Sequence, residues 1–132
     1  MMQRQLAQLL FGFTLAMVPT VGSAQVAAPD SAAVLAGKRL YEGRGLCASC
    51  HGKDGEGILG PTLKLNAGKK VWLHTDGSLR SIVALIKSGL EPSVTESGIT
   101  MPARGGARLT DEQVEQVAAY VMHLHRTAPA SP

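Results

Sequence analysis

Apolar residues recur every three or four positions in three stretches of the chain, a spacing typical of amphipathic helices. The first stretch follows Asp30 and Ser31, either of which can cap a helix. Its apolar face contains Val34, Gly37, Leu40 and Tyr41. Glycine inside a helix costs about 1 kcal/mol relative to alanine. We therefore expect another backbone to approach closely at Gly37.

The second stretch begins after Asp76 or Ser78, either of which can serve as N-cap, and Gly89 is its natural stop. Its apolar face contains Leu79, Ile82, Val83, Ile86 and Leu90. This pattern predicts a second amphipathic helix that packs one face on a core.

The third stretch carries the most complete helix signals. Thr110 as N-cap and Gln113 three residues later form a capping box, and Leu109 can pack on Val114 as a hydrophobic staple. The apolar stripe contains Val114, Val117, Ala118, Val121 and Leu124. These signals predict a long final helix.

Polar and glycine-rich segments separate the three helices. Residues 52–61 contain four glycines and residues 91–100 are mostly polar, so both are expected to be loops. No segment alternates apolar and polar residues convincingly as a strand does. The pattern therefore predicts an all-α fold in one domain.

The first 24 residues have the features of a secretory signal peptide. Arg4 precedes a mostly apolar run over residues 6–18, and small residues lead to a cleavage site after Ala24. An uncleaved membrane anchor is the alternative, but the strongly apolar part, residues 9–18, is shorter than the ~20 residues a spanning helix needs. We expect periplasmic export without stable membrane insertion, a flexible lead-in over residues 25–32, a domain over residues 33–127 and a disordered tail over residues 128–132.

Composition indicates that the mature domain is short of large apolar side chains. Phe11 and Phe13 leave with the signal peptide, and the aromatic residues that remain are Tyr41, Trp72 and Tyr120. A buried apolar cofactor would supply the missing bulk. The formal charge of +3 falls by one when Arg4 is removed, and no basic run suggests a nucleic-acid partner.

The segment Cys47-Ala48-Ser49-Cys50-His51 reads C-x-x-C-H, the signature of c-type haem attachment. In this chemistry the two thiols bond to the vinyl groups of one porphyrin, and His51 binds the iron axially. A disulfide, a thioredoxin-like redox pair and a zinc site are the alternatives. The chain shows no βαβ context for the redox pair, and its two cysteines are too few for a zinc ribbon.

A six-coordinate haem iron needs a second ligand on the face opposite His51. The candidates with a sulfur or imidazole donor are Met101, Met122, His74, His123 and His125. Met101 lies in an expected loop, and the ring of Pro102 restricts the backbone beside it. We favour Met101, since a loop can present its thioether from the far side of the haem. His/Met ligation raises the reduction potential.

The chain resembles the class I cytochromes c, which are small mono-haem proteins with a methionine ligand. The resemblance covers residues 33–126 and is carried by Gly37, Tyr41, the C-x-x-C-H segment, Gly60-Pro61, Met101-Pro102 and Ala119-Tyr120-Val121. It implies the class I cytochrome c fold, in which the first and last helices cross and pair Gly37 and Tyr41 with Val117, Tyr120 and Val121. It also implies that the Pro61 carbonyl accepts a hydrogen bond from the His51 ring and that Trp72 contacts a haem propionate.

We therefore expect a one-electron carrier rather than an enzyme, with one covalent haem c per chain. It would act in a respiratory chain between exported or membrane partners, with a dehydrogenase or reductase as donor and an oxidase or other protein as acceptor. It would be a monomer or a subunit of a complex. The alternatives are the haem c subunit of a periplasmic dehydrogenase and, from another class, a peroxidase or gas-binding haem protein.

Three basic residues close to the candidate ligands suggest a docking surface. Arg104 and Arg108 follow Met101, and Lys53 follows the attachment segment. These charges would attract an acidic partner and speed the encounter. An ordinary solvated surface is the alternative.

Overall fold

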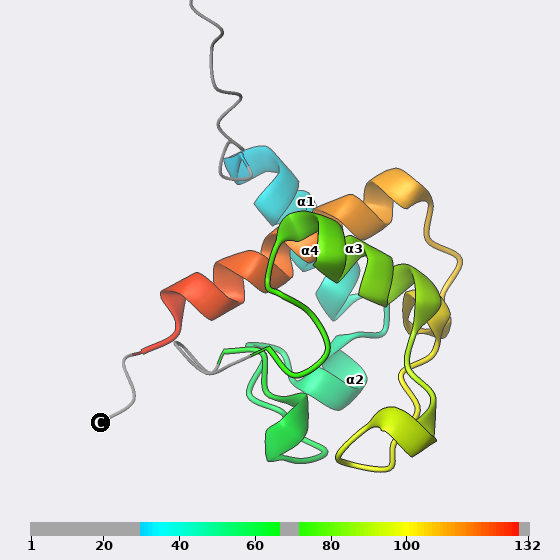
Figure 1. Cartoon of the computed structure of the whole chain (residues 1–132). Coiled ribbons are helices and arrows are strands. Elements are labelled where there is room, and N and C mark those ends of the chain that lie inside the picture. Colours follow the sequence, from blue (N-terminus) through cyan, green and yellow to red (C-terminus); the bar gives the residue numbers. More distant parts are fainter. Residues whose placement is uncertain (1–29, 67–71, 130–132) are drawn as a thin grey trace, which may run out of the picture.

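The computed structural model describes residues 30–66 and 72–129, and all of its regular elements in these ranges are helical (Figure 1). The α-helices are α1 (Ser31–Glu42), α2 (Ala48–His51), α3 (Leu79–Ser88) and α4 (Asp111–Thr127). Three short 3-10 helices are η1 (Pro61–Leu63), η2 (Pro92–Val94) and η3 (Ala103–Gly106). Leu90 and Met101 form an isolated antiparallel bridge. The all-α prediction is confirmed.

Helix α1 begins where its capping residue predicts. The Ala33 N–H donates to Asp30 Oδ1 at 2.6 Å, and the helix starts at Ser31. Residues 31 and 32, which were expected in the flexible lead-in, are therefore helical. The predicted signal peptide, residues 1–24, and the cleavage site after Ala24 lie outside the described residues. No helix in the described part of the chain is long and apolar enough to span a bilayer.

Helices α1 and α4 cross at Gly37. A Cβ atom built on Gly37 would lie 1.9 Å from the carbonyl oxygen of Gln116 and 3.0 Å from Cβ of Tyr120, so only glycine allows the two backbones to come this close. One turn later the Tyr41 ring meets the Tyr120 ring edge-on, with centroids 5.2 Å apart. The predicted crossing of the first and last helices is confirmed.

Helix α3 completes the core by packing on α4. Ser78 caps its N-terminus by accepting from the Ser81 N–H at 3.2 Å, and Gly89 follows its last residue. Ile82 and Ile86 are buried on the face that the periodicity predicts. The residues that form the core are Tyr41, Ile82, Ile86, Leu109, Val114, Val117, Ala118, Tyr120, Val121 and Leu124.

The first turn of α4 is fixed by contacts that reach two other segments. Its capping box is present as predicted, because Thr110 Oγ1 accepts from the Gln113 N–H and Gln113 Oε1 accepts from the Thr110 N–H. Gln113 Oε1 also accepts from the Arg44 guanidinium at 2.7 Å, which ties the turn after α1 to the start of α4. In Figure 1 the small helix α2 lies below this framework, at the end of that turn.

The close approach at Gly37 gives a prediction of stability. Gly37→Ala should lower the free energy of unfolding by about 2–3 kcal/mol, because the new methyl group overlaps backbone atoms of α4 that cannot rotate away. Chemical denaturation followed by circular dichroism measures this. The control Ala84→Gly removes a methyl group from an exposed position of α3 and should cost about 1 kcal/mol from helix propensity alone. An increase in stability for Gly37→Ala would contradict the close contact.

Candidate functional site

A tight turn places both thiols of the attachment segment on one helical turn. Cys47 is the N-cap of α2, and Cys50 and His51 lie within the helix, so the Cys50 and His51 N–H groups both donate to the Cys47 carbonyl. Residues three apart on a helix lie on the same side, which brings both sulfurs to one face. Both cysteines are free thiols. The segment therefore has two free thiols beside one imidazole.

The backbone immediately before Cys47 is strained. Leu46 has a φ of 60°, in the left-handed region that a leucine rarely adopts, and its side chain is 55% exposed. Gly45, just before it, is buried, and a Cβ atom there would lie 2.6 Å from the Leu40 carbonyl oxygen. Strained residues of this kind are concentrated at functional sites. Here the strain turns the chain from α1 into the attachment helix within a few residues.

His51 is held in one tautomer by a backbone carbonyl. Its Nδ1 lies 2.7 Å from the carbonyl oxygen of Leu63. A carbonyl can only accept, so Nδ1 carries the proton and Nε2 keeps a free lone pair. Burial lowers the pKa of His51, although the hydrogen bond to Leu63 partly opposes this effect. The ring is therefore neutral near pH 7, as a metal ligand must be.

The carbonyl that orients His51 belongs to Leu63 and not to Pro61, so the prediction for Pro61 is wrong in this structure. Pro61 is the first residue of η1, and its carbonyl oxygen faces the Lys64 N–H at 3.3 Å within that turn. The carbonyl that faces the His51 imidazole is two residues further along the chain, at the end of the 3-10 turn. Pro61 thus shapes the turn, and Leu63 makes the contact.

Tyr41 supports the residue that follows His51. Its hydroxyl donates to the Gly52 carbonyl at 2.7 Å, and the side chain is fully buried. Burial raises the pKa of Tyr41, so the hydroxyl keeps its proton and remains a donor. The sequence pattern indicated only that Tyr41 packs on α4. The contact with Gly52 links the helix crossing to the end of the attachment helix.

Met101 lies on a segment that is hydrogen-bonded to Leu90 at one end and packs against the attachment turn at the other. It exchanges two hydrogen bonds with Leu90, of 2.8 and 2.9 Å, and its half-buried side chain packs against the core. The segment then enters η3. A Cβ atom on Gly105 would lie 2.5 Å from the Gly45 carbonyl oxygen and 3.8 Å from Cys47 Sγ. The chain after Met101 is thus in contact with the segment that carries Cys47.

The other candidate ligands make contacts of their own. His74 Nε2 lies 3.0 Å from Glu96 Oε2, and the His123 ring stacks on Tyr120 with centroids 6.3 Å apart. The His125 ring lies 4.4 Å from that of Trp72. Met122 is half-buried in α4 against the core. Trp72 therefore packs on the last turn of α4.

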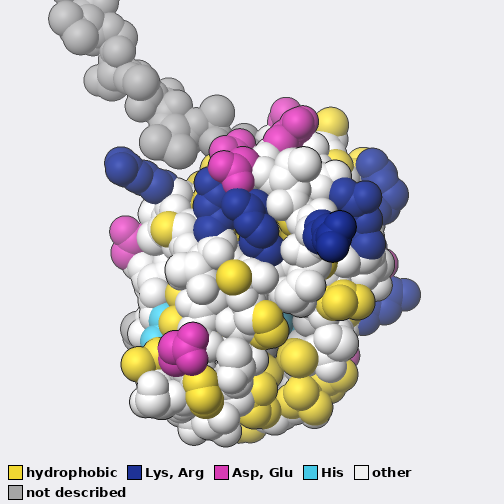
Figure 2. Space-filling model, turned by 90° about the vertical axis from the view of Figure 1, so that its right-hand side faces the viewer, with side chains coloured by type: hydrophobic (Ala, Val, Ile, Leu, Met, Phe, Trp, Pro, Cys, Tyr) yellow, Lys and Arg dark blue, Asp and Glu magenta, His cyan; other side chains and the backbone are white. Residues whose placement is uncertain are grey.

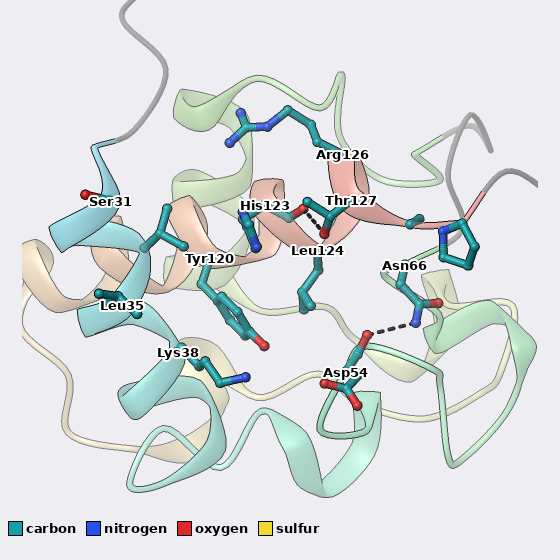
Figure 3. A pocket seen from close by; sticks show the side chains of 13 residues that line it. Ser31, Leu35, Lys38, Asp54, Asn66, Tyr120, His123, Leu124, Arg126 and Thr127 are labelled. Carbon is teal, nitrogen blue, oxygen red and sulfur yellow. Dashed lines mark hydrogen bonds between the residues drawn. The ribbon is translucent and has the colours of Figure 1, made fainter.

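A separate hollow of about 690 Å³ lies between α1, α4 and the loop after α2 (Figure 3). Lys38, Asp54, Asn66 and Tyr120 are among the side chains that line it, and the Asn66 amide donates to the Asp54 carbonyl at 2.8 Å. The hollow includes none of the residues Cys47, Cys50, His51 and Met101. It is therefore distinct from the attachment segment.

The chemistry of the donor set fits a covalently attached haem. Two free thiols, a neutral imidazole with its Nε2 available and a thioether in a segment that packs close by are the groups that c-type haem requires. Three large apolar side chains near α2, Leu46, Ile58 and Leu59, are at least half exposed and would pack against an apolar macrocycle. Within residues 30–66 and 72–129, no three His, Cys, Asp or Glu side chains gather to hold a metal ion.

Comparison with known proteins relates the chain to a protein family. Residues 32–121 match the model of a family described as cytochrome C oxidase, cbb3-type, subunit III. The matched range spans more than half of the chain and contains every residue of the candidate site. No match was found among curated proteins or among solved structures.

The environment of Cys47 gives a prediction for the haem-free chain. Burial raises the pKa of the Cys47 thiol to about 11. In a Cys50→Ala variant without haem, alkylation at pH 8.5 should be on the order of 100-fold slower in the folded chain than in urea, where the thiol has its usual pKa of about 8.5. Mass spectrometry measures the rates, and circular dichroism shows that the chain without urea is helical.

A Cys47→Ala variant provides the comparison, because it retains only Cys50. Equal alkylation rates for Cys47 in the helical chain and in urea would show that this thiol is not shielded.

Proposed function

The chain belongs to this family of c-type cytochromes, and we propose that it is a one-electron transfer protein carrying a single haem c. Cys47 and Cys50 would bond the haem covalently, and His51 and Met101 would be the two ligands of its iron. Bound haem would supply the redox chemistry, a one-electron change between Fe(II) and Fe(III). The protein is a carrier and turns over no substrate by itself.

The observation that carries this proposal is the fixed tautomer of His51. The Leu63 carbonyl holds the proton on Nδ1, which leaves Nε2 as the donor, and the two thiols lie on the same helical turn. A hydrogen bond of this kind also increases the basicity of the ligand. The Tyr41 hydroxyl holds the Gly52 carbonyl, so the backbone around His51 has little freedom to move when the charge of the iron changes.

Met101 is proposed as the sixth ligand because the segment that follows it packs against the attachment turn. The Leu90 bridge fixes its backbone, and η3 contacts Gly45. The three histidines that were also candidates have partners elsewhere in the fold. A thioether is a soft ligand that favours Fe(II), so this ligation suits a carrier of high potential. Trp72 remains proposed as a propionate contact.

The proposed compartment is the periplasm, and the proposed partners are redox proteins. The signal-peptide pattern of residues 1–24 supports export. On the side that carries η3 and the start of α4, Lys and Arg side chains gather above and apolar side chains below (Figure 2). An apolar area beside charged groups is typical of transient docking surfaces, where charge speeds the encounter.

A second proposal is that the chain is the haem c subunit of a larger redox complex, such as a periplasmic dehydrogenase. The matched family is described as an oxidase subunit, which favours a subunit role. Gel filtration of the haem-stained protein in a gentle extract separates the two proposals. A single small domain would support the free carrier, and co-elution with a large enzyme would support the subunit.

Replacing the sixth ligand tests the ligation directly. Met101→Ala should leave the haem attached but lower the reduction potential by on the order of 0.1 V, a fraction of the ~0.8 V over which axial ligands set haem potentials. It should also let carbon monoxide bind rapidly without denaturant. Redox titration and absorption spectra measure both effects.

The matched control is Met122→Ala, which truncates a half-buried methionine that packs on the core from α4. Its potential and carbon monoxide binding should match those of the unaltered protein. If Met101→Ala behaved like this control, the sixth ligand would have to be sought elsewhere.

A further inference from the structure

The segment that carries Met101 continues into a strained turn. Within η3, Arg104 has φ 54° and ψ 29°, and Gly105 follows with φ 67° and ψ 14°. Two successive residues in the left-handed region are unfavourable when one of them has a side chain. Such a turn persists only where its surroundings hold it. The side-chain contacts of Arg104 are therefore candidates for what holds this turn in place.

The Arg104 guanidinium holds this turn against the start of α4. Its Nη1 donates to the Leu109 carbonyl at 2.9 Å, and its Nη2 donates to Asp111 Oδ1 at 2.6 Å. The second carboxylate oxygen of Asp111 accepts from Lys87 at 2.6 Å, at the end of α3. The hydrogen bond from Lys87, which has the larger effect, and the one from Arg104 hold the pKa of the Asp111 carboxyl below its usual value. Three elements thus meet at one carboxylate.

Exposure limits what the charges alone contribute. The Asp111 side chain is 63% exposed and that of Arg104 is 30% exposed, so solvent screens their attraction. The contact with the Leu109 carbonyl does not depend on the carboxylate, and Leu109 itself is a buried core residue. The planar guanidinium, which binds a carbonyl and a carboxylate together, fixes the direction of the turn as well as its distance.

The turn that Arg104 holds is the part of the loop that contacts the attachment segment. The backbone at Gly105 packs on Gly45 so closely that a Cβ atom would overlap the Gly45 carbonyl oxygen. Met101 lies three residues before Arg104 and is itself the partner of Leu90 in the antiparallel bridge. Release of Arg104 would therefore free one of the two ends that fix Met101.

We propose that Arg104 is a positioning residue, which, through Leu109 and Asp111, holds the Met101 loop against the attachment turn and so keeps the methionine on the iron. This inference rests on the proposed function, in which Met101 is the sixth ligand. It replaces the interpretation of Arg104 as a docking charge, because its guanidinium is engaged within the chain. Arg108, by contrast, is exposed and makes no side-chain hydrogen bond or ion pair with the described residues.

The test compares Arg104→Gln with Arg108→Gln in the haem-loaded protein. Both variants remove one positive charge from the same loop, but only Arg104→Gln removes the two contacts. Arg104→Gln should weaken the sulfur-to-iron charge-transfer band of the ferric protein and lower the potential. It should also speed carbon monoxide uptake roughly three- to fivefold, the population change expected when a partly exposed ion pair is lost. Arg108→Gln should leave all three readouts unchanged.

Two further variants keep the test informative if the Arg104→Gln protein does not fold or does not acquire haem. Asp111→Asn should shift the same readouts in the same direction but less, because the contact with Leu109 survives. Arg104→Lys keeps the charge and loses the planar contact, so it should resemble Arg104→Gln. Identical behaviour of the Arg104, Asp111 and Arg108 variants would overturn the proposal.

Met101→Ala separates this inference from the function on which it rests. If Met101→Ala opens the iron and the Arg104 and Asp111 variants do not, the ligand assignment stands and the positioning role is wrong. If Met101→Ala itself leaves the band and the potential unchanged, both are wrong.

Discussion

The contact between α1 and α4 at Gly37 is the constraint on which the candidate site depends. Each of these helices is attached to one half of the site. The end of α1 leads through the strained turn at Leu46 to the thiols and His51, and the start of α4 holds the loop that follows Met101. If the helices lay further apart, the two halves would separate by a similar distance. The absence of a side chain at one residue thus sets the spacing of groups that are 50 or more residues apart in the sequence.

Much of this framework could be predicted from the sequence, because it follows from local rules. Ser78, Thr110 and Gln113 act as caps by forming short-range hydrogen bonds, and the three-and-four spacing identifies the buried face of each helix. The attachment segment could equally be predicted from the sequence, because its chemistry is contained in five consecutive residues. The close approach of the two helices at Gly37 could be inferred because glycine destabilises a helix interior, and close backbone packing offsets that cost.

The contacts that were missed or misassigned are those set by loop geometry. Which carbonyl faces His51 depends on how far η1 carries the chain, and the family resemblance placed it at Pro61, two residues early. Arg104 looked like a free charge, since its sequence neighbours do not show that the loop folds back on Leu109 and Asp111. Loop turns with residues in the left-handed region leave a weak signal in a single sequence.

The acceptor that orients His51 is a main-chain atom, and this has a consequence for how the protein can change. Substitution at position 63 alters a side chain but leaves the carbonyl in place, so the identity of Leu63 matters less to the imidazole than its position does. A one-residue insertion or deletion between α2 and η1 would instead bring a different peptide group opposite Nδ1. Within this loop, evolutionary drift in composition is therefore tolerated more readily than drift in length.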